Sequence, residues 1–369
     1  MDSSGDRTPV VVAARRTPVG TAGRALRDLD VAALAAPVLR AVLADAAASP
    51  DEVGDVVLGN VMGPGGDVAR VAALAAGFGH GVPGLTVDRQ CTSGLDAVVL
   101  AAGRVRAGEA DLLLAGGVES ASTSNRPYAR APFVPAGHDD PEMGVAAETV
   151  AREAGVGRGR QDLYAAGSHA RAVAAGDAGR FRAELVPVAG LHRDERPRRG
   201  LDERRLARLP PAFVAGGTVT AGNSCGVGDG AAAVALVSER QRLGRPGLAV
   251  RAVHVAGMDP TRCGLALVPA VRGALARAGL EVDDVGAVEL TEAFAGQVLA
   301  CVDVLGLSRE VVCADGGAIA LGHPWGASGA VLVVRLFGRM IRQDGPRYGI
   351  AACAAGGGQG VAVVVERVR

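Results

Sequence analysis

Three observations predict an α/β protein made of two similar halves. Short apolar runs alternate with longer segments whose apolar residues recur at helical spacing, which is typical of sheets covered by helices. Each half holds one glycine-rich turn that leads into an apolar helix. The chain has 369 residues, which is more than one domain of ordinary size needs and enough for two.

The first half, residues 1–240, opens with alternating strands and helices. Val and Leu clusters predict the strands, and Ala-rich amphipathic segments predict the helices. The expected strands are 10–13, 56–59 and 111–117. The expected helices are 31–46, 68–76 and 95–107.

Residues 119–215 break this alternation because they are polar and charged. We expect them to form an inserted lid over a site rather than part of a sheet. Arginines concentrate at 193–208, where a solvated face is the commoner explanation and a phosphate-binding surface is the alternative.

The second half, residues 243–369, repeats the pattern of the first. The expected strands are 248–255, 285–290, 348–352 and 361–366. The expected helices are 268–278, 295–304 and 328–340. Sequence identity between the halves is slight, yet their matching glycine-rich turns indicate similar folds packed together.

Composition excludes several classes of function. The formal net charge is zero, which gives no reason to expect binding to nucleic acid or to a membrane surface. All 39 basic residues are arginine, so lysine-linked cofactors and a Walker A phosphate loop are impossible. The polar start of the chain and the lack of a long apolar run lead us to expect a cytoplasmic protein. Six cysteines without metal-ligand spacing lead us to expect thiols rather than a metal site or a disulfide framework.

Cys91 is the first candidate for catalysis. It stands in a turn, Asp88–Leu95, at the predicted N-terminus of helix 95–107. Backbone N–H groups and the helix dipole at that position favour an anion, so we expect a lowered thiol pKa and a reactive thiolate. The alternative is a buried, inert cysteine.

His323 is the second candidate, in the glycine-rich loop Gly316–Gly329. A histidine between Gly322 and Pro324 is hard to explain as core packing, so its pairing with Cys91 favours nucleophilic sulfur chemistry. A third turn, Gly356–Gly360, supplies bare N–H groups that suit an oxyanion, although a tight turn in a sheet explains it equally simply.

These segments resemble the thiolase family in content and in order. The matching segments are Arg16–Gly20, Asp88–Leu95, Ala115–Ser120, Gly217–Gly230, Glu292–Ala295, Gly316–Gly329 and Gly356–Gly360. The resemblance covers nearly the whole chain. It implies two thiolase-type halves layered as α/β/α/β/α, with the lid inserted in the first half.

The resemblance also implies an activity, which is CoA-dependent thiolysis of a 3-oxoacyl-CoA to acetyl-CoA and a shortened acyl-CoA, or the reverse Claisen condensation. It makes Cys91 the acyl-accepting nucleophile, and it makes His323 its activator. The N–H groups of Cys91 and Gly356 would hold an oxyanion. Coenzyme A is then a substrate, and no cofactor is bound permanently. The residues that match the pantetheine and acyl path are Met143, Phe213, Ala221, Cys225, Ala293 and Phe294.

Two departures from the family touch the chemistry. Thr291 stands where the family usually has the asparagine that orients a water in an oxyanion site. The family's second catalytic cysteine should lie at Ala354, yet the cysteine is one place earlier, at Cys353. One residue reverses the direction of a side chain in a strand. Either a bulge in the strand returns Cys353 to the site, or the acid–base thiol is missing.

Two further departures concern binding and assembly. Cys225 replaces a serine that often contacts pantetheine, and Glu142 precedes Met143 where many members have histidine. The stretch 120–143, which includes the tetramer-forming loop of some members, looks short, so we expect a homodimer rather than a tetramer.

Two rival functions stay open at this point. One is a condensing enzyme of the ketosynthase or hydroxymethylglutaryl-CoA synthase kind. The other is a non-catalytic acyl-CoA-binding subunit, which Thr291 and Ala354 motivate.

Overall fold

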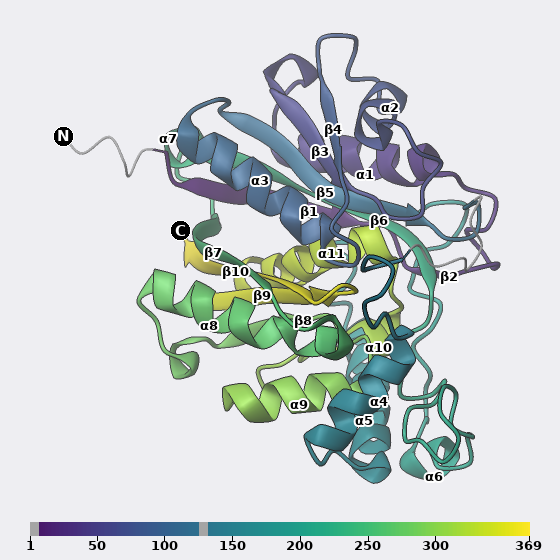
Figure 1. Ribbon diagram of the computed structural model, residues 1–369. Coiled ribbons are helices and arrows are strands. Elements are labelled where there is room, and N and C mark those ends of the chain that lie inside the picture. The colour runs from purple at the N-terminus through teal and green to yellow at the C-terminus, as the bar shows by residue number, and fades with distance from the viewer. Residues whose placement is uncertain (1–6, 125–131) are drawn as a thin grey trace.

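The computed structural model describes residues 7–124 and 132–369, and five layers make up its fold (Figure 1). Two helices cover one half of a sheet, two helices fill the centre, and two more cover the other half. This is the α/β/α/β/α arrangement that the resemblance implies. The start of the chain, residues 1–6, and residues 125–131 within the short stretch 120–143 lie outside the described residues.

Among the described residues, ten strands form one sheet in the order β4-β3-β5-β6-β1-β7-β10-β9-β8, with β2 paired to β6. The strands of the first half are β1 (Pro9–Arg16), β2 (Gly20–Thr21), β3 (Asp55–Gly59), β4 (Gly84–Val87), β5 (Leu112–Ser120) and β6 (Gly228–Ser238). Those of the second half are β7 (Gly247–Gly257), β8 (Ala287–Leu290), β9 (Tyr348–Ala355) and β10 (Gln359–Val368). A short antiparallel pairing joins the halves, where Val10 and Val11 of β1 face Ala249 and Leu248 of β7.

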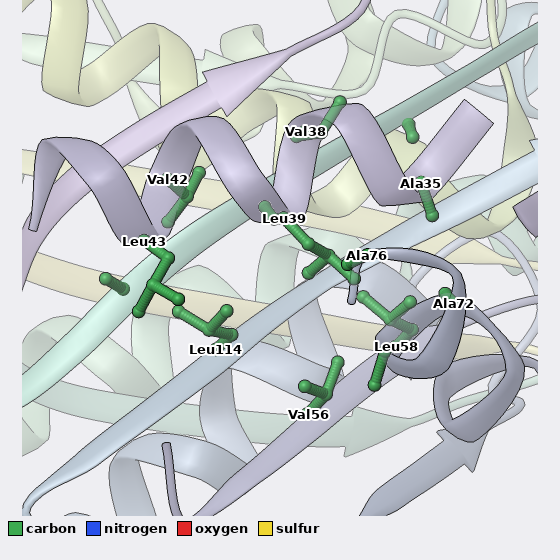
Figure 2. Packing of buried hydrophobic residues seen from close by; sticks show 14 of the residues in the cluster. Ala35, Val38, Leu39, Val42, Leu43, Val56, Leu58, Ala72, Ala76 and Leu114 are labelled. Atoms are coloured by element: carbon green, nitrogen blue, oxygen red, sulfur yellow. The ribbon is translucent and has the colours of Figure 1, made fainter. Parts of the chain in front are cut away.

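The outer helices of the first half are α1 (Val31–Asp45) and α2 (Val68–Ala75). Asp30 caps α1 by accepting a hydrogen bond from the backbone N–H of Ala33. The apolar face of α1 then packs on β3, β5 and α2, as Figure 2 shows for Leu39, Leu58 and Leu114. Full burial of a leucine of this kind stabilises the fold by roughly 1.5–3 kcal/mol.

The central layer consists of α3 (Ser93–Ala107) and α11 (Trp325–Phe337), which lie between the two halves of the sheet (Figure 1). Both helices follow the glycine-rich turns that the sequence singled out. The outer helices of the second half are α8 (Leu267–Ala278) and α9 (Ala295–Leu305). The remaining helical turns are η2 (Pro50–Glu52), α7 (Glu239–Arg242), η3 (Pro260–Ala266), η4 (Val282–Asp284), α10 (Ala318–Leu321) and η5 (Gly338–Arg342).

The insertion contains three helices that the sequence analysis did not predict, α4 (Met143–Glu153), α5 (Arg158–Asp177) and α6 (Glu203–Leu206). Apolar residues of α4 and α5 pack against α9, so this region joins the core of the second half. Strand β6 was also missed, because its Gly- and Ala-rich sequence lacks the residues that favour strands. Within the described ranges, no helix combines the length and apolar character needed to span a membrane.

Candidate active site

The Cys91 turn is held in a strained conformation just before α3. Gln90 has φ +50°, in the left-handed region that a side chain disfavours. Arg89 anchors the turn, because its Nε donates to Asp96 Oδ2 at 2.8 Å and its Nη1 donates to Gln359 Oε1 at 3.1 Å. Gln359 follows the Gly-rich turn before β10, so Arg89 ties the cysteine turn to the turn that contains Gly356.

Glycine brings the Cys91 turn against the His323 loop. A Cβ atom added to Gly94 would lie 2.6 Å from the carbonyl oxygen of Gly326, and one added to Gly329 would lie 2.4 Å from the backbone nitrogen of Leu95. The N-terminal turns of α3 and α11 therefore touch backbone to backbone, which side chains would prevent. This packing explains why glycine stands at position 94 in the first turn and at position 329 after the second.

Glu119, at the end of β5, forms hydrogen bonds that hold the start of α11 in place. Its carboxylate accepts hydrogen bonds from the backbone N–H groups of Met62 at 3.0 Å and Gly326 at 3.0 Å, and from Asn60 Nδ2 at 3.2 Å. Burial raises the pKa of Glu119 to about 7, while the backbone donors oppose that rise. The residue therefore positions the start of α11.

His323 is buried and held at two points. Its Nδ1 lies 2.6 Å from Ser328 Oγ, and its backbone N–H donates to the Gly226 carbonyl at 2.8 Å. Burial lowers the pKa of His323 to about 4. The imidazole is therefore neutral at neutral pH, with Nε2 able to act as a base if Nδ1 carries the proton toward Ser328.

The expectation of a lowered thiol pKa at Cys91 is wrong. Part of the cysteine surface is accessible, but burial is the largest influence and raises the pKa well above its ordinary value. Charges on Cys353, Cys225 and Cys263 would raise it further. Removal from water therefore outweighs the helix dipole, and the resting pair is a neutral thiol and a neutral imidazole.

Replacing Ser328 with alanine should slow acylation of Cys91 by about 10- to 100-fold, because the hydroxyl no longer fixes the tautomer and direction of His323. Rapid-mixing measurement of the acylation rate would detect the change. An unaltered rate would show that Ser328 does not orient the imidazole.

A cavity opens at the end of β8. Its walls come from α4, η3, α9 and the ends of β8 and β9, and its lining residues are Met143, Ala147, Cys263, Gly264, Thr291, Ala293, Phe294, Gln297, Ala354 and Ala355. Two buried polar atoms of this lining, Thr291 Oγ1 and Gln297 Oε1, have no hydrogen-bond partner among the described residues. Unpaired buried polar atoms are costly, so they indicate a place where a ligand or water binds.

Strand β9 has no bulge at Cys353. Its pairing with β10 runs without a register shift, with Cys353 opposite Val361 and Ala354 opposite Gly360. Cys353 therefore faces the central helices, is fully buried and contacts the Cys91 carbonyl oxygen at 3.2 Å. Ala354 faces the cavity instead. The bulge that would have returned Cys353 to the cavity is absent.

Burial raises the pKa of Cys353 to about 12, and the nearby Thr291 hydroxyl opposes that rise. The contact between the two groups lacks hydrogen-bond geometry, so Thr291 Oγ1 remains unpaired. Gly356 is buried as well, and a Cβ atom on it would lie 2.6 Å from the ring of Phe133. Only glycine fits between that ring and the end of β9.

Some of the predicted pantetheine residues line the cavity, and others contact its lining residues. Met143, Ala293 and Phe294 line the cavity, and the ring of Phe213 meets that of Phe294 edge to face at 6.0 Å. Cys225 donates its backbone N–H to the Ala293 carbonyl at 2.9 Å. Phe213 and Cys225 therefore contact residues of the cavity lining without lining the cavity themselves.

Ala221 lies in a second cavity that contains four arginines of the 193–208 run. The arginines are Arg196, Arg198, Arg199 and Arg205. Arg196 Nε is buried without a partner among the described residues, and burial lowers the pKa of this guanidinium. Arg198, Arg199 and Arg205 are exposed, as the commoner explanation of a solvated face predicts, whereas Arg196 is partly buried.

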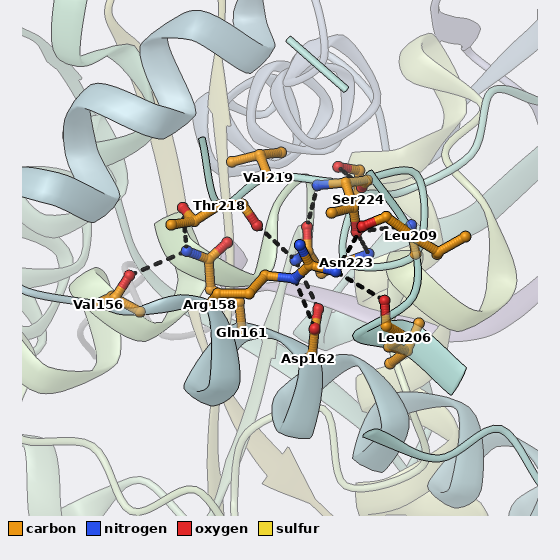
Figure 3. Close-up of polar contacts among 12 residues, drawn as sticks. Val156, Arg158, Gln161, Asp162, Leu206, Leu209, Thr218, Val219, Asn223 and Ser224 are labelled. Carbon is orange, nitrogen blue, oxygen red and sulfur yellow. Dashed lines mark hydrogen bonds and ion pairs between the residues drawn. The ribbon is translucent and has the colours of Figure 1, made fainter. Parts of the chain in front are cut away.

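The turn that carries Ala221 is rigidly held (Figure 3). Asn223 Nδ2 donates to Asp162 Oδ1 at 2.9 Å, and Arg158 Nε donates to Asp162 Oδ2 at 2.6 Å. Helix α5 of the insertion thus fixes the turn. Ser224 of the same turn forms a β-bridge with Phe294.

Comparison with known families decides the identity of this fold. The model of the thiolase N-terminal domain matches residues 9–240, and that of the thiolase C-terminal domain matches residues 244–367. The chain belongs to the thiolase family.

Relatives and solved structures agree with this assignment. A peroxisomal 3-ketoacyl-CoA thiolase A of Rattus norvegicus is 41% identical, over 97% of this chain and 88% of the relative. An acetyl-CoA acetyltransferase of Pseudomonas aeruginosa is 40% identical, over 97% and 99%. The crystal structure of the Bacillus anthracis acetyl-CoA acetyltransferase has a TM-score of 0.91 and 35% identity, over 99% of this chain and 100% of that one. Human mitochondrial 3-ketoacyl-CoA thiolase in complex with CoA has a TM-score of 0.90 and 34% identity, over 99% of both chains.

The thiolase fold brings together more than the sequence analysis singled out. It adds Ser328 behind His323, and it adds Cys263 and Gln297 in the cavity wall. It also adds Glu292, which is buried and accepts hydrogen bonds from Tyr164 and Ser168 of α5 at 2.8 and 2.7 Å. Ser328 and Glu292 lie within matched segments, which was the available signal for them. No sequence signal pointed to Cys263, which lies far from every motif along the chain.

Proposed function

We propose that this thiolase transfers acyl groups between Cys91 and coenzyme A, cleaving a 3-oxoacyl-CoA to acetyl-CoA and a shortened acyl-CoA or running the reverse condensation. The observation that carries the proposal is the backbone contact that brings the Cys91 turn against the His323 loop. The comparisons lend no support to the ketosynthase-like enzyme or to the non-catalytic subunit.

The first step makes a thioester on Cys91. His323 takes the thiol proton as the Cys91 sulfur attacks the keto carbon, and acetyl-CoA leaves as its enolate. Because the resting thiol has a raised pKa, deprotonation belongs to the attack itself rather than preceding it. CoA then takes the acyl group from Cys91. Splitting the reaction into two transfers avoids one difficult displacement.

Prepared hydrogen-bond donors stabilise the developing oxyanions. The N–H groups of Cys91 and Gly356 serve one oxyanion. The thioester oxygen is served by the Thr291 hydroxyl and by His323 once its Nε2 carries the Cys91 proton. Such donors act strongly in a site that excludes water, as the buried surroundings of Thr291 and His323 do here.

The arginine-lined cavity offers a place for the phosphates of CoA. Arg196, Arg198 and Arg205 supply positive charge, whereas Arg199 is already paired with Asp177, and Ala221 lies in the same lining. Arginine suits phosphate because its planar fork donates two parallel hydrogen bonds. The thin pantetheine arm would run along the Ala221 turn.

We propose a homodimer in the cytoplasm as the working form, on the short stretch 120–143 and the composition of the chain. Light scattering of the purified protein would measure its mass. A tetramer would overturn the assembly proposal without affecting the chemistry.

The activity is tested by CoA-dependent thiolysis of acetoacetyl-CoA, followed through loss of the enolate absorbance of the 3-oxoacyl-CoA. Longer 3-oxoacyl-CoA substrates belong in the same series, because chain length is a separate property. Absence of thiolysis with every chain length, in protein that is folded, would contradict the proposal.

Replacing Thr291 with valine tests the oxyanion role of its hydroxyl. Valine keeps the shape of the side chain and removes a buried polar atom that has no partner, so the free energy of unfolding should not fall. Condensation of acetyl-CoA should nevertheless slow by about 10- to 100-fold, because a donor to the thioester oxygen is lost. A lower free energy of unfolding together with the slower condensation would instead indicate that the hydroxyl has a structural role.

A further inference from the structure

The thiolase reaction needs a second acid–base group at the α-carbon of acetyl-CoA, and the cavity wall at the family position offers only a methyl group. Ala354 occupies that position and faces the cavity, whereas Cys353 faces the central helices. Cys353 also holds its sulfur 3.2 Å from the Cys91 carbonyl oxygen, within the hydrophobic core.

Another thiol lines the same cavity. Cys263 belongs to η3, the helical turn before α8, and shares the cavity wall with Ala354 and Thr291. Its Sγ lies 3.8 Å from the Sδ of Met143, the residue at the N-terminus of α4. A charge on Cys263 would raise the pKa of Cys91, so the two thiols lie within electrostatic reach of one another.

Two independent features mark this wall as a place for a ligand. Thr291 Oγ1 and Gln297 Oε1 are buried, unpaired among the described residues and part of the same lining as Cys263. Gln297 also donates to the Gly264 carbonyl at 3.1 Å, which fixes the turn that carries Cys263.

We propose that Cys263 is the acid–base residue that exchanges the α-proton, in place of a thiol at position 354. The inference rests on the proposed function and deepens it. In thiolysis, cleavage of the bond between the α- and β-carbons leaves its electron pair on the enolate of acetyl-CoA. The Cys263 S–H gives its proton to the α-carbon, and the resulting thiolate takes the proton of the incoming CoA thiol. CoA sulfur then attacks acyl-Cys91, and the departing Cys91 thiolate takes back the proton that His323 holds, so protons and charge balance over the cycle.

The test separates α-proton exchange from acylation. The wild type is mixed with acetyl-CoA in deuterated water, and two quantities are measured: acetyl groups on Cys91, and deuterium in the methyl group of acetyl-CoA. Cys263→Ala should still acylate Cys91 within about threefold of the wild-type rate, but should exchange the α-proton about 100- to 1000-fold more slowly. Cys353→Ala, the matched control, should exchange within about threefold of the wild type.

A rescue variant guards against a purely structural effect. Adding Ala354→Cys to Cys263→Ala places a thiol on the same cavity wall and should restore exchange by at least about tenfold. Cys263→Ser keeps the shape of the side chain with a weaker acid and should also exchange slowly while remaining folded.

Three results would overturn the proposal: unchanged exchange in Cys263→Ala, selective loss of exchange in Cys353→Ala, or loss of acylation together with exchange in both Cys263 variants. Failure of the wild type itself to acylate Cys91 would contradict the proposed function instead, so the two failures are distinguishable.

Discussion

Cys91→Ser should lower the rate of thiolysis by at least about 10⁴-fold. The hydroxyl is a far weaker acid than the thiol, and His323, whose pKa burial lowers to about 4, is a weak base for it. The change is nearly isosteric, so the contact between α3 and α11 should persist. Steady-state thiolysis of acetoacetyl-CoA measures the loss.

A second cysteine variant serves as the control, because it shows how activity responds when a buried thiol without a proposed catalytic role is replaced. Cys313 is a buried cysteine whose Sγ contacts the Leu290 carbonyl at 3.4 Å, away from the cavity lining. A serine hydroxyl can keep this contact, so Cys313→Ser should retain activity within about threefold. Equal losses in the two variants would contradict a special role for Cys91.

Arg335→Met should destabilise the protein by about 3–5 kcal/mol. Arg335 is almost fully buried in α11, pairs with Glu184 and with Asp315 at 2.6 Å, and lies over the ring of Phe181 at 4.4 Å. Methionine fills part of the volume but leaves two buried carboxylates with one cationic partner fewer. Urea-induced unfolding followed by circular dichroism measures the free energy of unfolding.

An exposed ion pair supplies the control for this experiment. Arg160 and Asp303 lie 2.8 Å apart with about two fifths of each side chain exposed. Arg160→Met should cost less than about 1 kcal/mol, because water already solvates both charges. A similar cost for the two variants would show that burial does not govern the Arg335 cluster.

The Arg335 cluster also explains why distant motifs belong together. Arg16 pairs with Glu184 at 2.8 Å and with Asp194 at 2.6 Å, so the end of β1, the insertion and α11 share one buried network. The network holds α11, the helix that directly follows the His323 loop. Sequence matching shows Arg16 as a motif residue, but its partners lie more than 160 positions away along the chain.

Much of the fold followed from local pattern. Strands β1, β3 and β7 and helices α1, α3 and α8 were predicted because their apolar residues repeat at the period of the element. Strand β6 was not predicted, because neighbouring strands rather than its Ala-rich sequence make it extended. Helices α4 and α5 were missed because polar residues such as Glu148, Asp162 and His169 lie on their buried faces, which interrupts the apolar pattern.

The residues of the site also differ in how far the sequence could predict them. A turn before a predicted helix indicated Cys91, and a glycine-rich loop indicated His323. The pKa of Cys91 was predicted in the wrong direction, because a helix N-terminus is visible in sequence and burial is not. The strand register of Cys353 and the arrival of Cys263 at the cavity depend on tertiary packing alone.

The central claim is that Cys91 carries the acyl group, and peptide mass analysis tests it directly. The protein is mixed with acetoacetyl-CoA without added CoA, quenched in acid and digested with trypsin. Cleavage after Arg89 and Arg104 releases a peptide in which Cys91 is the only cysteine. We predict one acyl group on this peptide, removed when CoA is added before the quench. An unmodified Cys91 peptide in protein that turns over substrate, or an acyl group on Cys225 or Cys263 instead, would contradict the account.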